Sequence, residues 1–244
     1  MKNLIIVTLA YNNQNEVENT LKSTASVRKS GVVTHFVFDG STTDSVQEIC
    51  LAYSDLVYIL QTDTGIYDGI NKAIIFLKER FSQSFILLLH SGDEFLLSPP
   101  EVLDISRLDS GDLVVGSYLL ELKGFKKVKQ YNSNRQYEMP SSHQAIFYSL
   151  DLPISSLLYD TDYLICADYN NFLHLKYTKN VKIIYVDNIV SQFSVGGKST
   201  IEFNRLFVES TLIYHKFTRS CLKTAIRSVI LYTKLILKYV AYKS

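Results

Sequence analysis

Short runs of apolar residues alternate along the chain with longer segments in which apolar residues recur every three or four positions. The first pattern is typical of strands buried on both faces and the second of amphipathic helices. In the first half, the predicted strands are Leu4–Leu9, Thr34–Phe38, Leu56–Leu60 and Phe85–Leu89. The predicted helices are Gln14–Val27, Ser45–Ala52 and Ile66–Arg80. Because strands that alternate with helices form parallel sheets, we expect a doubly wound, Rossmann-like and mostly parallel α/β fold.

The pattern becomes less regular after Pro99 and Pro100. Here the expected elements are strands at Asp112–Leu120, Ala145–Tyr148 and Val181–Val186, helices at Tyr163–Leu175 and Ile201–Phe217, a basic loop or hairpin at Lys123–Lys129 and a loop at Ser191–Thr200. We find no internal repeat, low-complexity tract or linker. Residues 1–217 are therefore expected to form one domain with halves 1–98 and 99–217, followed by a separate helix over 218–244.

Polar residues follow each of the first four predicted strands. They are Asn12, Asp39, Asp63 and Asp93. Ligands of open α/β sheets bind outside the carboxyl ends of the strands, so these residues predict a polar crevice at one sheet edge. At the last of them, Gly92 would let a phosphate approach closely, while Asp93 and Glu94 could hold a divalent ion. The alternative is an Asp-Glu turn that merely ends a strand.

Composition and charge narrow the class of protein. Of 244 residues, 47% are hydrophobic and 20% charged, as in ordinary globular proteins. The net charge of +1 does not favour nucleic acid as a partner. Three widely spaced cysteines, Cys50, Cys166 and Cys221, suggest a reducing compartment without disulfides or a zinc site. The N-terminal apolar run is too short for a signal peptide, and no run is long enough to span a membrane. We therefore expect a cytoplasmic protein that is soluble or peripheral to a membrane.

The C-terminal segment differs from the rest of the chain in charge and pattern. It has six basic residues after Thr218 and no acidic one, so with a net charge of +1 the first 217 residues carry −5. At 100° per residue, one broad face of this segment holds Leu222, Ala225, Ile226, Val229, Ile230, Ile236, Leu237 and Val240. A neighbouring sector holds Lys223, Arg227, Lys234 and Lys238. This pattern suits a helix on an anionic membrane surface, with packing on the domain or on a second copy as alternatives.

Several of these segments carry a resemblance to a known family. They are Tyr11-Asn12, Asp39–Asp44, Leu89–Asp93, His143-Gln144, Ala167-Asp168-Tyr169 and Phe193–Ser199, together with Asp63-Thr64-Gly65-Ile66-Tyr67-Asp68-Gly69-Ile70-Asn71-Lys72-Ala73. The last is the most specific and resembles the pattern D-x-G-I-Y-D-A-M-N-K-G. In these segments the chain resembles family-2 glycosyltransferases of the GT-A fold. The match is to non-processive bacterial members that build surface polysaccharides of the colanic acid, O-antigen or capsule type.

One departure from that family pattern bears on chemistry. Gly92 stands where many relatives have an aspartate, so Asp93 is the candidate metal ligand, with Glu94 as a second candidate. The Q-x-x-R-W motif of processive members is absent, which argues against repeated chain elongation.

The resemblance implies an inverting transfer of a sugar from a nucleoside-diphosphate donor, most often a UDP-sugar, to a saccharide or lipid-linked acceptor. The departing diphosphate must be neutralised, and the acceptor hydroxyl must lose its proton. Asp93 would bind Mn²⁺ or Mg²⁺ for the first task. Asp168 would be the general base for the second, with Asp160 and Asp162 in reserve.

The other candidates would bind the donor, although each could instead be an ordinary turn, core or surface residue. They are Asp39 at the nucleotide base, Thr8, Tyr11, Asn12 and Asp63 beside it, Asn71 and Lys72 near the diphosphate, Gly92 beside a phosphate, His143 and Gln144 at phosphate or acceptor, and Lys198 as a clamp. We expect Asp39, Asp93 and Asp168 to line one shared cavity. A sugar-phosphate nucleotidyltransferase and a non-catalytic nucleotide-sugar-binding module remain alternatives. The nucleotidyltransferase would need a glycine-rich basic loop after the first strand, and Ala10–Gln14 does not provide one.

Overall fold

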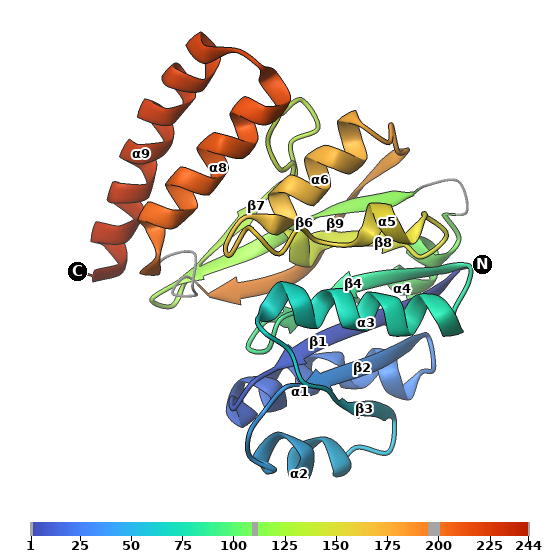
Figure 1. The fold of residues 1–244 in the computed structure, drawn as a ribbon. Helices are drawn as coiled ribbons and strands as arrows, with labels where there is room; N and C mark the ends of the chain where they lie inside the picture. Colours follow the sequence, from blue (N-terminus) through green and yellow to red (C-terminus); the bar gives the residue numbers. More distant parts are fainter. Residues whose placement is uncertain (1, 109–111, 195–200, 244) are drawn as a thin grey trace.

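The computed structural model describes residues 2–108, 112–194 and 201–243, without the side chains of 238 and 241–243. Its strands are β1 (Asn3–Ala10), β2 (Val33–Asp39), β3 (Leu56–Leu60), β4 (Ser84–Leu88), β5 (Glu94–Phe95), β6 (Leu113–Leu122), β7 (Phe125–Lys129), β8 (Ile146–Ser149) and β9 (Ile183–Ser194). Within the described residues they form one nine-stranded sheet in the order β3-β2-β1-β4-β8-β6-β9-β5, with β7 paired to β6 (Figure 1).

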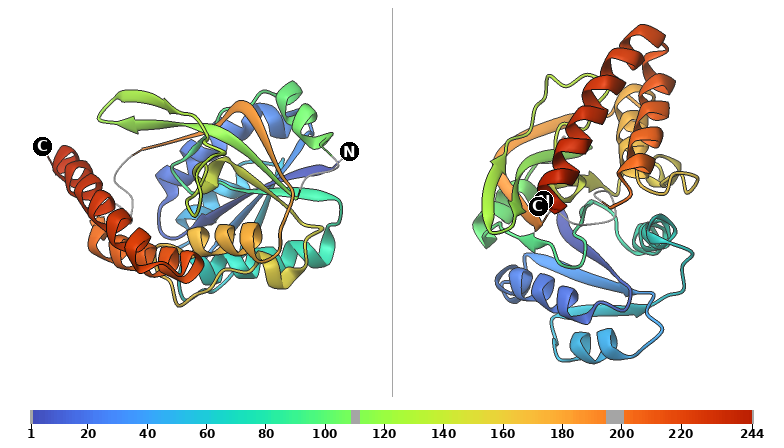
Figure 2. Two further views of the ribbon diagram at one scale, coloured as in Figure 1. Left: turned by 90° about the horizontal axis from the view of Figure 1, so that it is seen from above. Right: turned by 90° about the vertical axis from the view of Figure 1, so that its left-hand side faces the viewer.

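The sheet is mostly parallel, as the alternating pattern predicted. Strands β1 to β4 are parallel neighbours, and β9 is parallel to β6. The exception in the middle is β8, which pairs antiparallel with both β4 and β6. The predicted fold class is therefore confirmed: a mixed α/β fold built on a curled, mostly parallel sheet with helices on both faces (Figure 2).

Helices cover the two faces because successive strand residues point to opposite sides. They are α1 (Gln14–Lys29), α2 (Ser45–Leu51), α3 (Ile66–Arg80), α4 (Pro99–Ser106), α5 (Ile154–Leu157) and α6 (Ala167–Tyr177). In β1, Ile5 and Val7 pack into the core shared with α3, α5 and α6, whereas Leu4 and Ile6 pack into the core shared with α1 and α4. Strands β1, β2 and β4 are thus buried on both faces, as their continuous apolar runs indicated. The edge strand β3 is not, and Val57 and Leu60 are exposed.

Two element boundaries in the second half differ from the prediction. Helix α6 begins at Ala167 rather than Tyr163, because the backbone N–H groups of Leu164, Ile165 and Cys166 bind the carboxylate of Glu209 instead of continuing a helix. Strand β9 runs on to Ser194, through part of the predicted loop, because it pairs with both β6 and β5. The basic segment at 123–129 forms a hairpin with β6, one of its two predicted forms.

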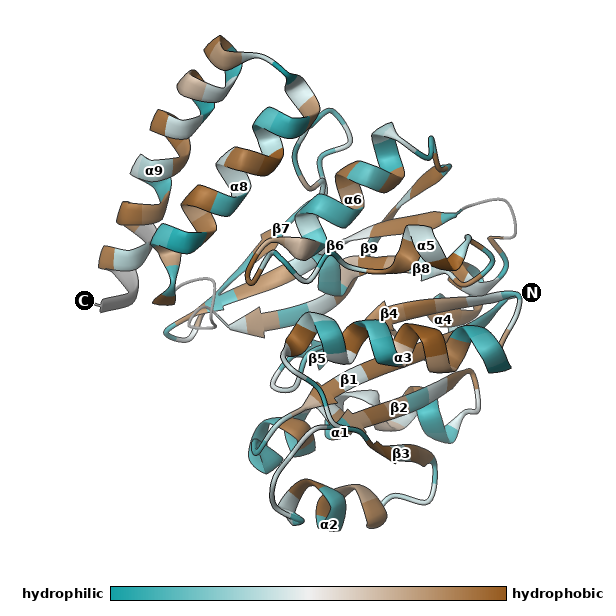
Figure 3. Ribbon diagram, in the orientation of Figure 1, coloured by the Kyte–Doolittle hydropathy of each residue, from teal (hydrophilic) through white to brown (hydrophobic). Residues whose placement is uncertain are grey.

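Two C-terminal helices, α8 (Phe203–Thr218) and α9 (Cys221–Lys243), form a hairpin beside α6 at one side of the sheet (Figures 1 and 2). Leu235 of α9 is buried, and Phe207 of α8 packs edge to face against Tyr232 of α9. Hydrophobic residues recur along the outer side of α9 (Figure 3). Among the described residues, none of the helices combines the length and the apolar character that a membrane crossing requires.

Candidate active site

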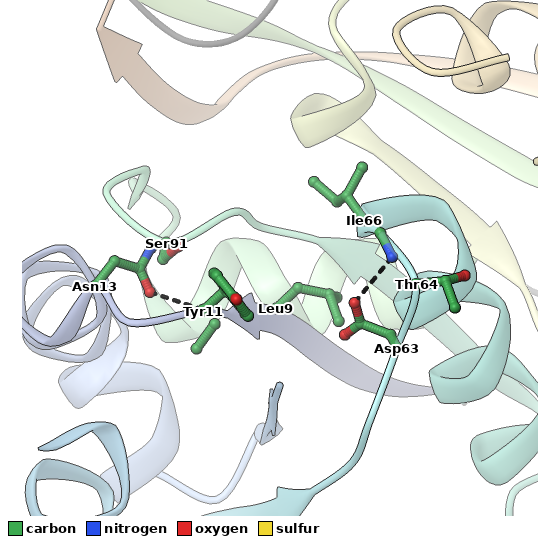
Figure 4. Close-up of a pocket in the computed structure, with 9 residues that line it drawn as sticks. Leu9, Tyr11, Asn13, Asp63, Thr64, Ile66 and Ser91 are labelled. Carbon is green, nitrogen blue, oxygen red and sulfur yellow. Dashed lines mark hydrogen bonds between the residues drawn. The ribbon is translucent and has the colours of Figure 1, made fainter. Parts of the chain in front are cut away.

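A cavity of about 510 Å³ lies at the carboxyl ends of the parallel strands (Figure 4). Three segments line it, namely Leu9, Ala10, Tyr11 and Asn13 at the end of β1, Asp63–Ile66 after β3, and Ser91 after β4. Tyr11 is 63% exposed at its mouth. This position and size are those of a small-molecule site in an open α/β sheet. Of the four strand-end residues from which the sequence predicted a crevice, Asp63 lines this cavity, whereas Asn12, Asp39 and Asp93 do not.

Hydrogen bonds tie the loops around this cavity to one another. Asn12 adopts a positive φ of 51°, and its backbone N–H donates to the Ser41 hydroxyl over 2.8 Å. The side-chain oxygen of Asn12 accepts the N–H of Thr42 over 3.0 Å. On the other side, the Asn13 amide donates to the hydroxyl of Ser91. The loop after β1 is thereby fixed to the loops after β2 and β4.

Asp63 is held between two glycines. A Cβ atom at Gly40 would lie 2.7 Å from Asp63 Oδ2, and one at Gly69 would lie 3.0 Å from the same oxygen. The other oxygen, Oδ1, accepts the N–H of Gly65 over 3.1 Å (Figure 4). Both glycines belong to the sequence motifs, and their lack of a side chain is what lets this carboxylate reach the cavity wall.

Asp39 and Thr8 lie buried beneath the cavity, which they do not line. The Asp39 carboxylate accepts the Ser41 N–H and the Tyr58 hydroxyl, each over 2.9 Å. The Thr8 hydroxyl donates to the Leu89 carbonyl over 2.8 Å and also bonds the ring of His35. The side chains of Asp39 and Thr8 therefore form hydrogen bonds within the protein and hold the strand ends in place.

Asn71 and Lys72, expected near the diphosphate, are also engaged elsewhere. The Asn71 amide donates to the carbonyl of Tyr159 over 2.9 Å and accepts its N–H over 2.7 Å. Lys72 Nζ donates to the Thr62 carbonyl over 2.7 Å and pairs with Asp68 over 2.9 Å. Neither lines the cavity. Instead, Asn71 fixes the loop at Tyr159 to α3, and Lys72 fixes the loop after β3 to the same helix.

The turn after β4 presents Asp93, the candidate metal ligand. Its Oδ2 accepts the amide N–H of Gln144 over 3.1 Å. Gly92, at a φ of 92°, donates its N–H to the Glu16 carbonyl and the Thr20 hydroxyl, and that hydroxyl donates to the Asp93 carbonyl. Burial raises the pKa of Asp93 to about 6, although His143 and Gln144 oppose that rise.

No group of three or more His, Cys, Asp or Glu side chains in the described part of the chain is arranged to hold a metal. The carboxylate of Glu94 accepts a hydrogen bond from Gln192 in the neighbouring strand β9. Asp93 therefore fits a divalent ion as one oxygen ligand, with the rest of the ion's shell left to phosphate and water.

The candidate base Asp168 belongs to a chain of three side chains. Its Oδ2 lies 3.1 Å from His143 Nδ1, and Nε2 of His143 lies 2.6 Å from Nε2 of His90. Burial alone would raise the pKa of Asp168, but the hydrogen bond and charge of His143 bring that pKa below its ordinary value. Burial, followed by the charge of His143, lowers the pKa of His90 to about 3. Asp168 is thus an ionised carboxylate at the start of a helix, where the dipole also favours negative charge.

The single cavity expected for Asp39, Asp93 and Asp168 is not the one observed, because none of the three lines it. Asp93 and Asp168 are connected to the cavity indirectly, through the turn after β4. Ser91 lines the cavity, while His90 and Asp93 of the same turn contact His143 and Gln144. The reserve bases Asp160 and Asp162 lie in an exposed turn. Lys198 lies outside the described residues.

Two residues in this region were not anticipated from the sequence. His90 replaces the asparagine of the L-N-S-G-D pattern, and that substitution was the available signal for its contact with His143. Glu209 of α8 binds the turn before Asp168, and its position within an amphipathic helix carried no local signal. Both contacts join segments that are far apart in the sequence.

The arrangement of the sheet and its helices is a GT-A-like fold. Two solved structures show the likeness. TarS of S. aureus, residues 1–349 in complex with UDP, superposes with a TM-score of 0.60 at 13% identity, covering 92% of this chain and 68% of that one. The mannosyltransferase PcManGT of Pyrobaculum calidifontis, in complex with GDP-Man and Mn²⁺, superposes with a TM-score of 0.65 at 10% identity, covering 99% and 73%.

A curated relative adds a likeness in sequence. The chain is 28% identical over 188 residues to an uncharacterized glycosyltransferase of Mycobacterium tuberculosis, found in strains CDC 1551 and H37Rv. The match covers 67% of this chain and 64% of the mycobacterial protein, so the chain spans less than two thirds of the relatives it matches. No protein-family model matches.

Proposed function

We propose that this protein is an inverting, metal-dependent glycosyltransferase that moves a hexose from a UDP-sugar, or another nucleoside-diphosphate sugar, to a saccharide or lipid-linked acceptor. One observation carries the proposal. The adjacent residues His143 and Gln144 hold Asp168 and Asp93, so a base and a phosphate-side carboxylate are fixed to one short turn. The fold, the cavity at its strand ends and the sequence motifs support the same activity.

In this proposal the donor's nucleotide occupies the cavity, with Tyr11 and Asp63 at its walls. Asp168 removes the proton of the acceptor hydroxyl as that oxygen bonds to the anomeric carbon. The bond from that carbon to the diphosphate breaks, and the nucleoside diphosphate departs. His143 keeps the carboxylate of Asp168 oriented and ionised before the proton is taken.

Asp93 would hold Mn²⁺ or Mg²⁺, and the ion, when bound, would neutralise the charge on the departing diphosphate. The buried environment of Asp93 suits this role, because charge interactions are strong where water is scarce. Gln144 orients the carboxylate from the protein side. The complex of PcManGT with GDP-Man and Mn²⁺ supports a divalent ion in this fold.

We place the activity in the assembly of a bacterial surface polysaccharide at the cytoplasmic face of the membrane. The support is the likeness of the motifs to non-processive enzymes of that kind, together with the outer face of α9. On that face Leu222, Val229 and Leu237 are at least 65% exposed. This apolar face would be buried in an anionic membrane surface, and the basic residues that flank it would bind the lipid headgroups.

The test is release of nucleoside diphosphate from a panel of UDP- and GDP-sugars with Mn²⁺, with and without saccharide acceptors. Asp93→Asn and Asp168→Asn should each lose transfer by about 10²-fold or more, while Asp168→Asn still binds the donor. Asp104→Asn is the matched control, because it makes the same change on an exposed side chain of α4. Full activity in Asp168→Asn would refute the base assignment, and no turnover of any donor would refute the proposed class.

A further inference from the structure

The turn that precedes Asp168 is held by one carboxylate from the C-terminal hairpin. Glu209 Oε1 accepts the N–H of Leu164 over 3.0 Å. Its Oε2 accepts the N–H groups of Ile165 and Cys166, each over 2.9 Å. These are three consecutive backbone donors, and charge-assisted bonds of this kind are stronger and more directional than neutral ones. The side chain therefore fixes the path of the backbone into α6.

A second contact holds the same turn from the opposite direction. The Tyr67 hydroxyl of α3 donates to the Ile165 carbonyl over 2.6 Å. The turn is therefore clamped between α3 of the donor-binding half and α8 of the hairpin. Asp168 is the second residue of α6, so its position depends directly on where this turn lies.

We infer that Glu209 is a positioning residue for the general base, and that the α8–α9 hairpin is part of the catalytic apparatus through this contact. This inference rests on the proposed function. Asp168 must lie within hydrogen-bond reach of the acceptor hydroxyl, and misplacement by about 1 Å can cost about 10²-fold in rate. Glu209 does not touch the reacting groups; it sets where the carboxylate of Asp168 stands relative to His143.

Glu209→Gln is the variant that tests this role. The glutamine has the same shape, but its amide N–H₂ group faces backbone N–H donors instead of accepting from them. We expect kcat to fall about tenfold or more with the donor KM within twofold of wild type, because the donor cavity does not include this turn. Glu202→Gln is the control: it makes the same change on a residue that pairs with Arg205 at the start of α8.

Coupling to Asp168 separates positioning from simple stabilisation of the fold. In an Asp168→Asn background, Glu209→Gln should cause no further loss of the residual rate, because its effect passes through the base. Melting temperatures measured alongside would keep every assay well below unfolding. If the losses of the two substitutions were additive, the inference would be wrong. It would also be wrong if Glu209→Gln lowered the melting temperature but left kcat within twofold of wild type, because Glu209 would then only stabilise the turn.

The inference also has a readout that does not depend on turnover. In Glu209→Gln the backbone amides of residues 164–168 should lose protection against hydrogen exchange, and the NMR signals of His143 should shift as its contact with Asp168 loosens. Unchanged protection and unchanged His143 signals would overturn the inference. If the wild type transferred no sugar, the proposed function would fail, and this measurement alone would decide the role of Glu209.

Discussion

His143 Nδ1 lies 3.1 Å from Asp168 Oδ2, and the two side chains are only 19% and 22% exposed. The contact joins the short turn before β8 to the first turn of α6, across a distance of 25 residues in the sequence. Burial by itself would favour the protonated carboxyl, so His143 is what keeps Asp168 ionised and able to accept a proton. This relationship has a measurable consequence for the pH dependence of the reaction.

Replacing His143 should move the acid limb of the pH–rate profile to higher pH. In the wild type the pKa of Asp168 is below its ordinary value, so this base stays ionised as pH falls, and the acid limb begins with Asp93, whose pKa is about 6. In His143→Gln the burial of Asp168 and of Asp93 is offset less, both pKa values rise, and activity is lost at a higher pH. The measurement is kcat against pH for both proteins. His215→Gln, an exposed histidine on α8, is the control and should leave the profile unchanged. A shift to lower pH would contradict this account.

The positions that could be predicted correctly from the sequence are those that depend only on neighbouring residues in the chain. Helix α3 has the predicted bounds of Ile66–Arg80, because its apolar spacing and the preceding Gly65 are local features. The strand-end position of Asp63 and Asp93 follows from the alternation of strands and helices, and both lie at the predicted edge.

The outcomes that could not be predicted depend on partners distant in the sequence. The Asn71 amide is taken by the backbone of Tyr159, and the start of α6 is set by Glu209, 42 residues further on. The hydroxyl of Thr8 forms hydrogen bonds with the His35 ring and the Leu89 carbonyl. A motif identifies which residue types occur together, but which atom each side chain bonds is settled by tertiary packing.

Adding a methyl group at Gly40 should destabilise the protein through Asp63. The new Cβ atom would lie 2.7 Å from Asp63 Oδ2, which no relaxed contact allows, so we expect Gly40→Ala to cost about 1–3 kcal/mol. Urea unfolding measures this cost, and nucleotide binding should weaken as Asp63 is displaced from the cavity wall. In an Asp63→Ala background the clash is absent, so Gly40→Ala should then have little effect. An equal cost in both backgrounds would show that the methyl group meets something else.

His35 should make the fold sensitive to acid. It is fully buried between the hydroxyls of Thr8 and Thr24, and burial, helped by the charge of Arg28, lowers its pKa to about 3. An unfolded histidine binds a proton near pH 6.5, so between about pH 6.5 and 3 the unfolded state binds more protons than the folded state. Stability should therefore fall by about 1.4 kcal/mol per pH unit as pH drops through this window, and be unaffected by His35 above it.

Urea unfolding at several pH values checks the role of His35. His35→Gln removes this titration, so its stability should depend on pH less steeply than that of the wild type below pH 6.5, whatever its stability at pH 7. His215→Gln should keep the wild-type slope, because that side chain is exposed in both states. Equal slopes for the wild type and His35→Gln would mean that His35 is protonated in the folded protein.

The outer face of α9 should bind anionic membranes, and the structure sharpens which residues matter. Arg227 is turned inward over the ring of Tyr214 and beside Glu138, so it should contribute little, whereas Lys223 and Lys234 are exposed. At about 1 kcal/mol for each positive charge near such a surface, Lys223→Gln with Lys234→Gln should weaken binding roughly 30-fold. Co-sedimentation with vesicles of mixed neutral and anionic lipid measures this, and Val229→Glu should weaken binding through the apolar face.

Unchanged binding of all these variants would remove the membrane from the proposal, and a concentration-dependent dimer lost in Val229→Glu would assign the face to a second copy of the chain.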